Sequence, residues 1–257
     1  MTPPLFLLDD LSAAKVGGQL VLTGSEARHA VTVKRLAVAE EVLLSDGRGR
    51  RVRAVVATIE RGGSARGGGD GDRVGLTVLS VEDVRGADPR FVVVQALPKG
   101  ERAELAVEVL TELGVDEIVP WSASRSISQW RAGEKVDKGV AKWRRTAAEA
   151  AKQSRRSTLP EVAGLRSTTE VCQLIRQAEL SLVLHEDAAD ALTATVLPPT
   201  GSVVIVVGPE GGIAEDELAS FTAAGARAVR LGTEVMRTST AGAAALSVLS
   251  ALTGRWA

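Results

Sequence analysis

Two glycine-bearing loops, each between a strand-like run and a helix, hold the residue types best suited to binding a small molecule. The first, Gly208-Pro-Glu-Gly-Gly212, follows the unbroken β-branched run 203–207, and the second extends from Gly232 to Arg237. Glycine lets backbone N–H groups approach a ligand without a Cβ atom in the way. Ligands bind beyond the carboxyl ends of strands in open α/β sheets. The sequence therefore predicts a shared small-molecule pocket, with an ordinary strand-to-helix turn as the alternative at the first loop.

The chain lacks the signatures of the common nucleotide loops and of a metal centre. A phosphate loop ends in Gly-Lys-Ser/Thr and a dinucleotide fingerprint reads G-x-G-x-x-G, and neither fits 208–212. Cys172 is the only cysteine, and the two histidines, His29 and His185, lie far apart in the sequence. An internal disulfide and a cysteine zinc cluster are therefore excluded, and no metal is expected. Cys172 is predicted to pack on a helix.

The elements that must position these loops alternate between strands and helices after Pro89. Strand-like runs occupy 91–97, 117–119, 181–184, 203–207 and 228–231. One helix is predicted at about 101–113, and a terminal helix is predicted to end at about residue 252. This alternation is typical of a mainly parallel sheet with helices on both faces. The run 203–207, apolar on both faces, predicts a central strand.

Two finer predictions concern the helices. Leu105, Val109 and Leu113 recur at i, i+4 and i+8, which predicts a buried stripe on the first helix. Ser239 or Thr240 is predicted to N-cap the terminal helix.

Residues 1–84 have a different pattern. Short strand-like runs separated by turns occupy 19–22, 41–45, 51–59 and 74–81. They predict a small β-barrel domain, and 85–257 is predicted to form a second, α/β domain. The tract 61–73 is too rich in glycine and charge to pack, so it predicts a mobile hairpin loop.

Charge is unevenly distributed along the chain, although its 31 Lys and Arg nearly balance its 32 Asp and Glu. Between residues 121 and 160, ten basic residues accompany three acidic ones. Clustered cations suit a phosphate backbone because their binding releases counterions. The cluster indicates RNA binding, with a solvated helix face as the alternative. No apolar run reaches the roughly 18 residues of a membrane-spanning helix, and no secretory signal pattern opens the chain, so a cytoplasmic protein is expected.

The sequence resembles a known family, the SPOUT class of S-adenosylmethionine-dependent RNA methyltransferases. Within that class it is similar to the bacterial 16S rRNA uracil-N3 methyltransferases of RsmE type, over nearly the whole chain. The resemblance rests on these motifs: Gly208-Pro-Glu-Gly-Gly212 with Glu215 and Glu217; Leu231-Gly232 with Arg237 and Thr240-Ala241; Leu97-Pro-Lys-Gly100 before Thr111-Glu-Leu-Gly-Val115; Arg125-Ser126; and the stretch 142–160.

The resemblance implies both architecture and activity. The first domain would be a PUA-like RNA-binding module, and the second a SPOUT domain with a deep trefoil knot that acts as a homodimer. The activity would be methylation of N3 of a uridine in the decoding region of 16S rRNA, on the assembled or nearly assembled small subunit. S-adenosylmethionine would be the only cofactor. A ribose 2′-O-methyltransferase of the same class and a non-catalytic RNA-binding module are the alternatives.

The resemblance also assigns site residues. Arg237 is the candidate for stabilising the uracil anion, unless it pairs with Glu210 or Glu234. Glu210 is a candidate proton acceptor, although a role in bracing loop N–H groups is favoured. The donor-binding candidates are Leu184, Gly208, Pro209, Gly211, Gly212, Leu231, Gly232, Val235, Met236, Thr240 and Ala241. For Met236 the alternative is a core side chain.

The candidate RNA contacts are Arg28, Lys34, Arg35, Lys99, Arg125, Arg144, Arg145, Arg155 and Arg156. The chain departs from the family pattern in two places. Ser239 stands where many relatives have Glu, and Val109 stands where a lysine is common, so a carboxylate mechanism at 239 and a basic contact at 109 are not expected.

Overall fold

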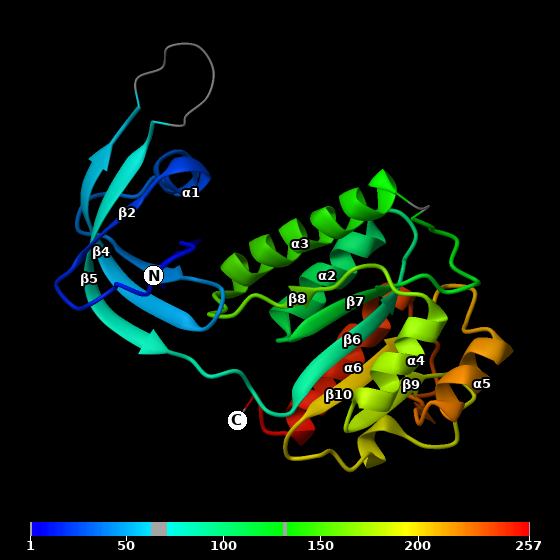
Figure 1. Ribbon diagram of the computed structural model, residues 1–257. Coiled ribbons are helices and arrows are strands. Elements are labelled where there is room, and N and C mark those ends of the chain that lie inside the picture. The colour runs from blue at the N-terminus through cyan, green and yellow to red at the C-terminus, as the bar shows by residue number, and fades with distance from the viewer. Residues whose placement is uncertain (1, 63–70, 131–132, 257) are drawn as a thin grey trace. The chain divides into compact units, whose positions relative to one another are not determined.

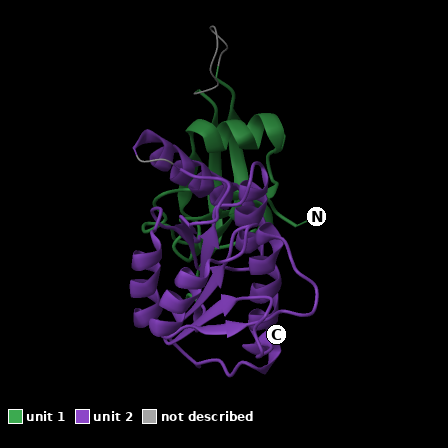
Figure 2. Cartoon of the chain, turned by 90° about the vertical axis from the view of Figure 1, so that its right-hand side faces the viewer, with its two compact units in different colours: residues 1–86, 151–159 green, residues 87–150, 160–257 purple. Residues whose placement is uncertain are grey.

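The computed structural model describes residues 2–62, 71–130 and 133–256, which form two compact units (Figures 1 and 2). The first unit comprises residues 1–86 and 151–159, and the second comprises 87–150 and 160–257. The sequence predicted domains at 1–84 and 85–257, which would put residues 151–159 in the second domain. In the structure these residues group with the first unit. Most of the predicted hairpin loop, residues 63–70, lies outside the described residues.

The first unit is built on a five-stranded sheet. Its strands, in the order β1-β3-β4-β5-β2, are β1 (Leu5–Leu7), β3 (Glu41–Ser45), β4 (Arg50–Glu60), β5 (Arg73–Asp83) and β2 (Gln19–Leu22). The pairs are antiparallel except β1 with β3. Val52, Ala54 and Val56 alternate toward one core with α1 (Gly24–Arg28), as period-2 patterning requires. A π-helical turn, His29–Val33, follows α1 directly.

The second unit contains a six-stranded, fully parallel sheet. Its strands, in the order β11-β9-β10-β6-β7-β8, are β11 (Arg227–Val229), β9 (Leu180–Leu184), β10 (Ser202–Val207), β6 (Arg90–Ala96), β7 (Glu117–Trp121) and β8 (Glu161–Val162). β10 and β6 are central and pair in register from Ser202 opposite Arg90 to Val207 opposite Gln95. The prediction that 203–207 forms a central strand is confirmed.

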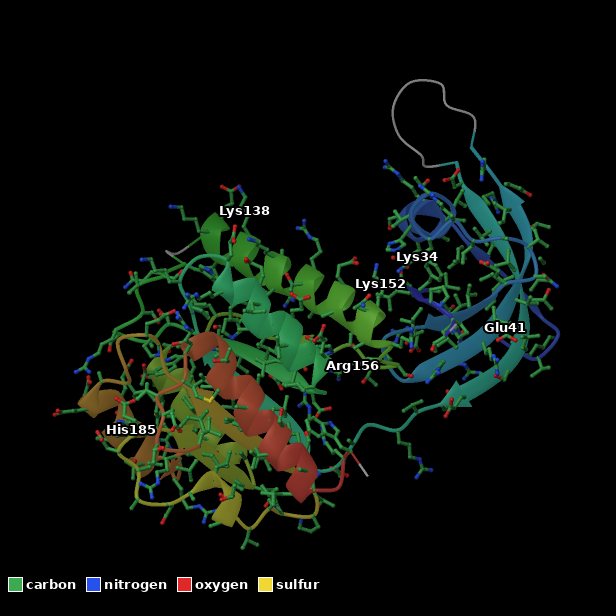
Figure 3. The ribbon with its side chains drawn as sticks, turned by 180° about the vertical axis from the view of Figure 1, so that it is seen from behind. Lys34, Glu41, Lys138, Lys152, Arg156 and His185 are labelled. Carbon is green, nitrogen blue, oxygen red and sulfur yellow. The ribbon has the colours of Figure 1, made fainter. Side chains whose placement is uncertain are left out.

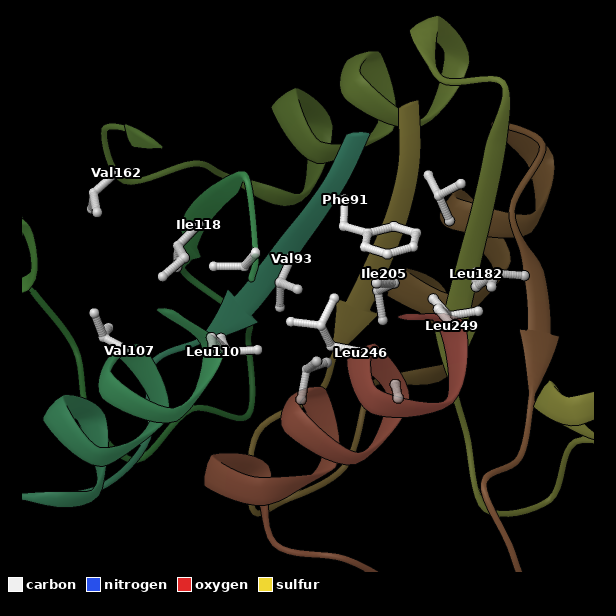
Figure 4. Close-up of a cluster of buried hydrophobic side chains, with 14 of the residues drawn as sticks. Phe91, Val93, Val107, Leu110, Ile118, Val162, Leu182, Ile205, Leu246 and Leu249 are labelled. Carbon is white, nitrogen blue, oxygen red and sulfur yellow. The ribbon is translucent and has the colours of Figure 1, made fainter. Parts of the chain in front are cut away.

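Helices cover both faces of this sheet. Phe91 and Val93 face one core, with α2 (Arg102–Glu112), α3 (Glu134–Ser154) and α6 (Thr238–Leu252), as Figure 4 shows for α2 and α6. Val92 and Val94 face the other core, with α4 (Thr168–Gln177) and α5 (Glu215–Ala223). Cys172 is buried on α4, as predicted. A short 3₁₀ turn, Leu192–Ala194, follows β9.

Both finer helix predictions were wrong. The buried residues of α2 are Ala106, Val107, Leu110 and Thr111, and Leu105 is 43% exposed. The predicted stripe of Leu105, Val109 and Leu113 is not the buried face of α2, because the helix packs on the sheet through the face that carries Val107 and Leu110. The terminal helix begins at Thr238 with Arg237 at the N-cap, so Ser239 and Thr240 lie inside its first turn.

The end of α6 is fastened to the amino edge of the parallel sheet. The Arg255 guanidinium donates to the Asp116 carboxylate at 2.7 Å and to the Gly114 carbonyl at 3.0 Å. It also lies over the Phe91 ring, 4.0 Å from the centroid. In the part of the chain that the structure describes, no helix is long and apolar enough to cross a membrane.

Candidate active site

The loops at the carboxyl edge of the parallel sheet form the candidate site. They follow β6, β7, β9, β10 and β11, five adjacent strands, so the topology brings sequence-distant loops to one edge. Both predicted glycine loops lie here, at 208–212 after β10 and at 231–237 after β11.

The loop 208–212 is a tight turn that needs its glycines. The Gly212 N–H donates to the Pro209 carbonyl at 3.0 Å, and Gly212 has φ +74°, in the left-handed region. A Cβ atom at Gly208 would lie 2.7 Å from Cγ1 of Ile213. At Gly212 a Cβ atom would meet nothing within 4 Å, so the backbone faces open space there.

Glu210 braces this loop against its neighbour. Its Oε1 accepts the backbone N–H of Lys99, in the loop after β6, at 3.0 Å. The geometry therefore favours the bracing role over that of a proton acceptor. Among the described residues Arg237 forms no ion pair with Glu210 or Glu234.

Gly211 brings the loop after β7 against the same turn. A Cβ atom at Gly211 would lie 3.0 Å from the carbonyl oxygen of Arg125 and 3.2 Å from its Cβ. The two backbones thus meet where only glycine fits without displacement. The candidate RNA contact Arg125 lies directly beside the candidate donor loop.

Glu217 is a buried residue that the sequence marked only as part of a motif. It is 4% exposed on the first turn of α5. Its carboxylate accepts from the Ser124 N–H at 2.9 Å, the Thr168 hydroxyl at 3.0 Å and the Ala214 N–H at 3.3 Å. A buried carboxylate with three donors on three segments fixes those segments relative to one another.

Gln95 fixes the start of α6. This side chain, 1% exposed at the end of β6, donates through Nε2 to the Thr238 carbonyl at 3.2 Å. The Arg237 carbonyl accepts from the N–H groups of Thr240 and Ala241, both at 2.9 Å. The backbone of Arg237 is therefore held while its side chain is exposed.

The loop 231–237 is held only at its ends. In the part of the chain that the structure describes, no hydrogen bond or ion pair involves residues 231–236. Val235 is 76% exposed and Met236 is 41% exposed, so the alternative of Met236 as a core side chain is wrong. Leu184, Leu231 and Ala241 pack at the margin of one core, beside this loop.

These residues fit a ligand that has an apolar ring and hydrogen-bonding groups at its edge. Glycine turns offer backbone amides, and Leu184 and Leu231 offer half-buried apolar surface. The Gln95 Oε1 is buried without a hydrogen-bond partner in the described structure. Among the described residues no group of three or more His, Cys, Asp or Glu could hold a metal ion.

The candidate RNA residues are divided between the units. Arg28, Lys34, Arg35, Arg155 and Arg156 belong to the first unit, and Lys99, Arg125, Arg144 and Arg145 belong to the second.

Several cations of the basic cluster have structural partners. Lys142 pairs with Glu104 at 2.7 Å, Lys138 with Glu134 at 2.6 Å, and Arg144 donates to the Val162 carbonyl at 3.1 Å. Figure 3 labels Lys138 on α3, with Lys34, Lys152 and Arg156 in the first unit. Arg131 lies outside the described residues.

A perturbed carboxyl group lies away from this edge. Burial raises the pKa of Glu117, and the opposing effect of Arg90, whose guanidinium is 3.0 Å away, is smaller. Both residues are at the amino ends of their strands. The shift therefore reflects packing of the sheet edge, not the candidate site.

Comparisons with known proteins define the class. Residues 87–250 match the family model of an RNA methyltransferase domain, and residues 22–64 match that of an RNA methyltransferase PUA domain. The chain therefore has the RNA methyltransferase domain and the PUA domain of an RNA methyltransferase. A relative from Mycobacterium bovis, named ribosomal RNA small subunit methyltransferase E, is 45% identical over 100% of this chain and 94% of its own length. One of the same name from Bacillus subtilis is 28% identical over 89% of this chain and 88% of its own length. The chain belongs to the ribosomal RNA small subunit methyltransferase E family, as its sequence motifs predicted.

Solved structures agree with this assignment. A ribosomal RNA small subunit methyltransferase E from Neisseria gonorrhoeae, bound to S-adenosylmethionine, has a TM-score of 0.82 and 27% identity over 98% of both chains. A methyltransferase from Legionella pneumophila, in complex with the same cofactor, has a TM-score of 0.82 and 26% identity over 98% of both chains. The predicted fold class, a PUA-like domain before an α/β domain with a parallel sheet, is confirmed. The trefoil knot stays a prediction.

Proposed function

We propose that the protein transfers a methyl group from S-adenosylmethionine to N3 of a uridine in the decoding region of 16S rRNA, on an assembled or nearly assembled small subunit. The observation that carries the proposal is the braced glycine loop 208–212 at the carboxyl edge, in a chain 45% identical to a relative named for small-subunit rRNA methylation. The cofactor bound in the two solved relatives supports S-adenosylmethionine as donor.

The donor supplies a methyl group on a sulfonium, which is already electrophilic, so the protein has to position the acceptor and manage its proton. The loop 208–212 and the half-buried Leu184 and Leu231 hold the donor. The Arg237 guanidinium, exposed on a fixed backbone, stabilises the negative charge that forms on uracil when the N3 proton leaves. Glu210 keeps its loop in place through the Lys99 N–H.

RNA binding would use basic side chains of both units. Arg28, Lys34 and Arg35 lie on and after α1 and are exposed, as are Arg125 and Arg145 in the second unit. Such contacts position a phosphate backbone without reading its sequence. Arg144 has a structural contact to Val162 and would contribute less.

Assembly and location are part of the same proposal. The protein would act in the cytoplasm, where its rRNA substrate is assembled, as a homodimer and without a metal ion. The exposed Val235 and Met236 support the homodimer, because a second chain or a ligand would remove them from water.

The test is a methylation assay on small ribosomal subunits from cells that lack this gene, with labelled S-adenosylmethionine and nucleotide mapping by mass spectrometry. Label at N3 of a uracil is expected, also with enzyme that has been treated with EDTA and freed of the chelator before the subunits are added. Label on a ribose would replace the proposal by 2′-O-methylation. Donor binding without label on either mature subunits or assembly intermediates would contradict the proposed substrate, and no donor binding would indicate a non-catalytic RNA-binding module.

A further inference from the structure

Glu217 joins three segments that come from different parts of the chain. Ser124 lies in the loop after β7, Thr168 opens α4, and Ala214 precedes α5, and all three donate to one carboxylate. The side chain is almost entirely buried, so water does not replace a lost partner. In such a place each unpaired donor weakens the arrangement.

The direction of the hydrogen bonds requires a carboxylate. The Trp121 indole N–H can only donate, and it donates to the Thr168 hydroxyl at 3.3 Å. The Thr168 hydroxyl therefore gives its own hydrogen to Glu217. The Ser124 and Ala214 groups are backbone N–H donors, so all three partners require an acceptor. A carboxylate offers both of its oxygens as acceptors.

The loop that Glu217 holds is the one that carries Arg125. Ser124 is its immediate neighbour, and the Arg125 backbone touches the donor loop at Gly211. Glu217 thus fixes the loop 122–126 on one side, and the glycine contact fixes it on the other. The Arg125 side chain is exposed and has no hydrogen-bond or ion-pair partner among the described residues.

We propose that Glu217 is a positioning residue for RNA, which holds Arg125 beside the donor loop so that the substrate phosphate backbone meets a preformed contact. The inference rests on the proposed rRNA methylation. Glu217 itself touches neither substrate nor donor. Its effect reaches the RNA through the loop 122–126.

The first experiment is Glu217→Gln, measured as KM for small subunits, kcat, and donor affinity by titration calorimetry. An amide of the same shape keeps one acceptor oxygen and places an NH2 group at the other position, so either the Ala214 N–H or the Ser124 N–H and the Thr168 hydroxyl face a donor. We expect KM for the subunit to rise about 10-fold, while kcat and donor affinity change less than about 3-fold. Glu215→Gln is the matched control, because this exposed glutamate in the same helical turn undergoes the same charge change. It should leave KM unchanged.

A double-mutant cycle tests whether the effect passes through Arg125. Arg125→Ala alone should raise KM by a similar factor, and the double variant should be no worse than either single variant. Additive effects would show that Glu217 acts elsewhere and would overturn the proposal. Wild-type protein without methylation activity would instead contradict the proposed function, so the two failures are distinguishable.

Thr168 provides a second route should Glu217→Gln fold poorly. Thr168→Val removes the hydroxyl that donates to Glu217 and should raise KM in the same direction, and Thr168→Ser should restore it. The melting temperature of each variant is recorded beside KM. A lower melting temperature with unchanged KM in both Glu217→Gln and Thr168→Val would mean that Glu217 only stabilises the fold, which overturns the proposal.

Discussion

The two loops that frame the candidate site are held in opposite ways. The loop 208–212 is braced from two sides, by the Lys99 N–H on Glu210 and by the Arg125 backbone against Gly211. The loop 231–237 is fixed only where it enters and leaves, and its apolar side chains are exposed. One part of the site is therefore preformed within a single chain, and the other gains its contacts from whatever binds it.

The difference indicates that the two loops bind a ligand in different ways. A braced loop keeps backbone amides in place and loses little entropy when a ligand binds. An end-fixed loop can adjust, and burying Val235 and Met236 against a ligand or a second chain would each contribute up to about 1.5–3 kcal/mol. Variants in each loop should therefore fail differently.

The largest effect is expected at the adjustable loop. Arg237→Ala should lower kcat about 100-fold with little change in donor affinity, because a charge-stabilising donor acts in the transition state. Single-turnover methylation of small subunits measures it. Arg230→Ala, another exposed arginine close before this loop, is the control and should retain activity. Equal losses in both variants would remove Arg237 from the chemistry.

A variant in the braced loop 208–212 is expected to lower the affinity for the methyl donor. Gly212→Val forces a β-branched residue into the left-handed region and should weaken donor affinity at least about 10-fold, measured by titration calorimetry. Gly225→Val creates the same backbone strain at φ +109°, at the end of α5, and should leave donor affinity intact. Normal donor affinity in Gly212→Val would place the donor elsewhere.

A smaller effect is expected at the fixed end of the adjustable loop. Gln95→Leu removes the donor to the Thr238 carbonyl, a loss of about 1 kcal/mol that corresponds to about a fivefold lower kcat. Gln173→Leu, at an exposed position on α4, serves as the control. Unchanged kcat in Gln95→Leu would mean that the start of α6 does not depend on this bond.

The smallest effect on activity is expected at Glu117, at the opposite edge of the sheet. Because burial raises its pKa, the folded state binds this proton more tightly than the unfolded state, and stability from this group falls as pH rises from about 4.5 through the folded pKa. Urea unfolding between pH 4.5 and 7 should show a smaller loss for Glu117→Gln than for wild type. Methylation at pH 7 should be unchanged. A loss of methylation in this variant would break the contrast between the two edges.

The sequence predicted what depends on local pattern. The β-branched run 203–207 and its glycines identified the central strand and the first loop, and the motifs identified the family. The positions of the long-range partners could not be predicted in this way. Glu217 joins Ser124 and Thr168, 93 and 49 residues away, and neither spacing has a periodic signal.

The basic cluster shows the same limit. Its charges predicted an RNA surface, yet Lys142 pairs with Glu104 of α2 and Lys152 with Glu26 of the first unit. A count of charges within 121–160 cannot include acidic partners that lie far outside that stretch. No feature of the sequence indicated that residues 151–159 would group with the first unit, because α3 continues without a break across the boundary between residues 150 and 151.

The contacts of Arg255 with Asp116, Gly114 and Phe91 have a practical consequence for experiments on this enzyme. Because α6 starts at the carboxyl edge and its far end is fastened at the amino edge, beside Phe91, anything joined after it leaves the sheet on the side away from the glycine loops. A fluorescent reporter or a surface tether attached there is expected to leave ribosomal particles free access to the candidate site at the carboxyl edge. Immobilised enzyme could then be compared directly with enzyme in solution.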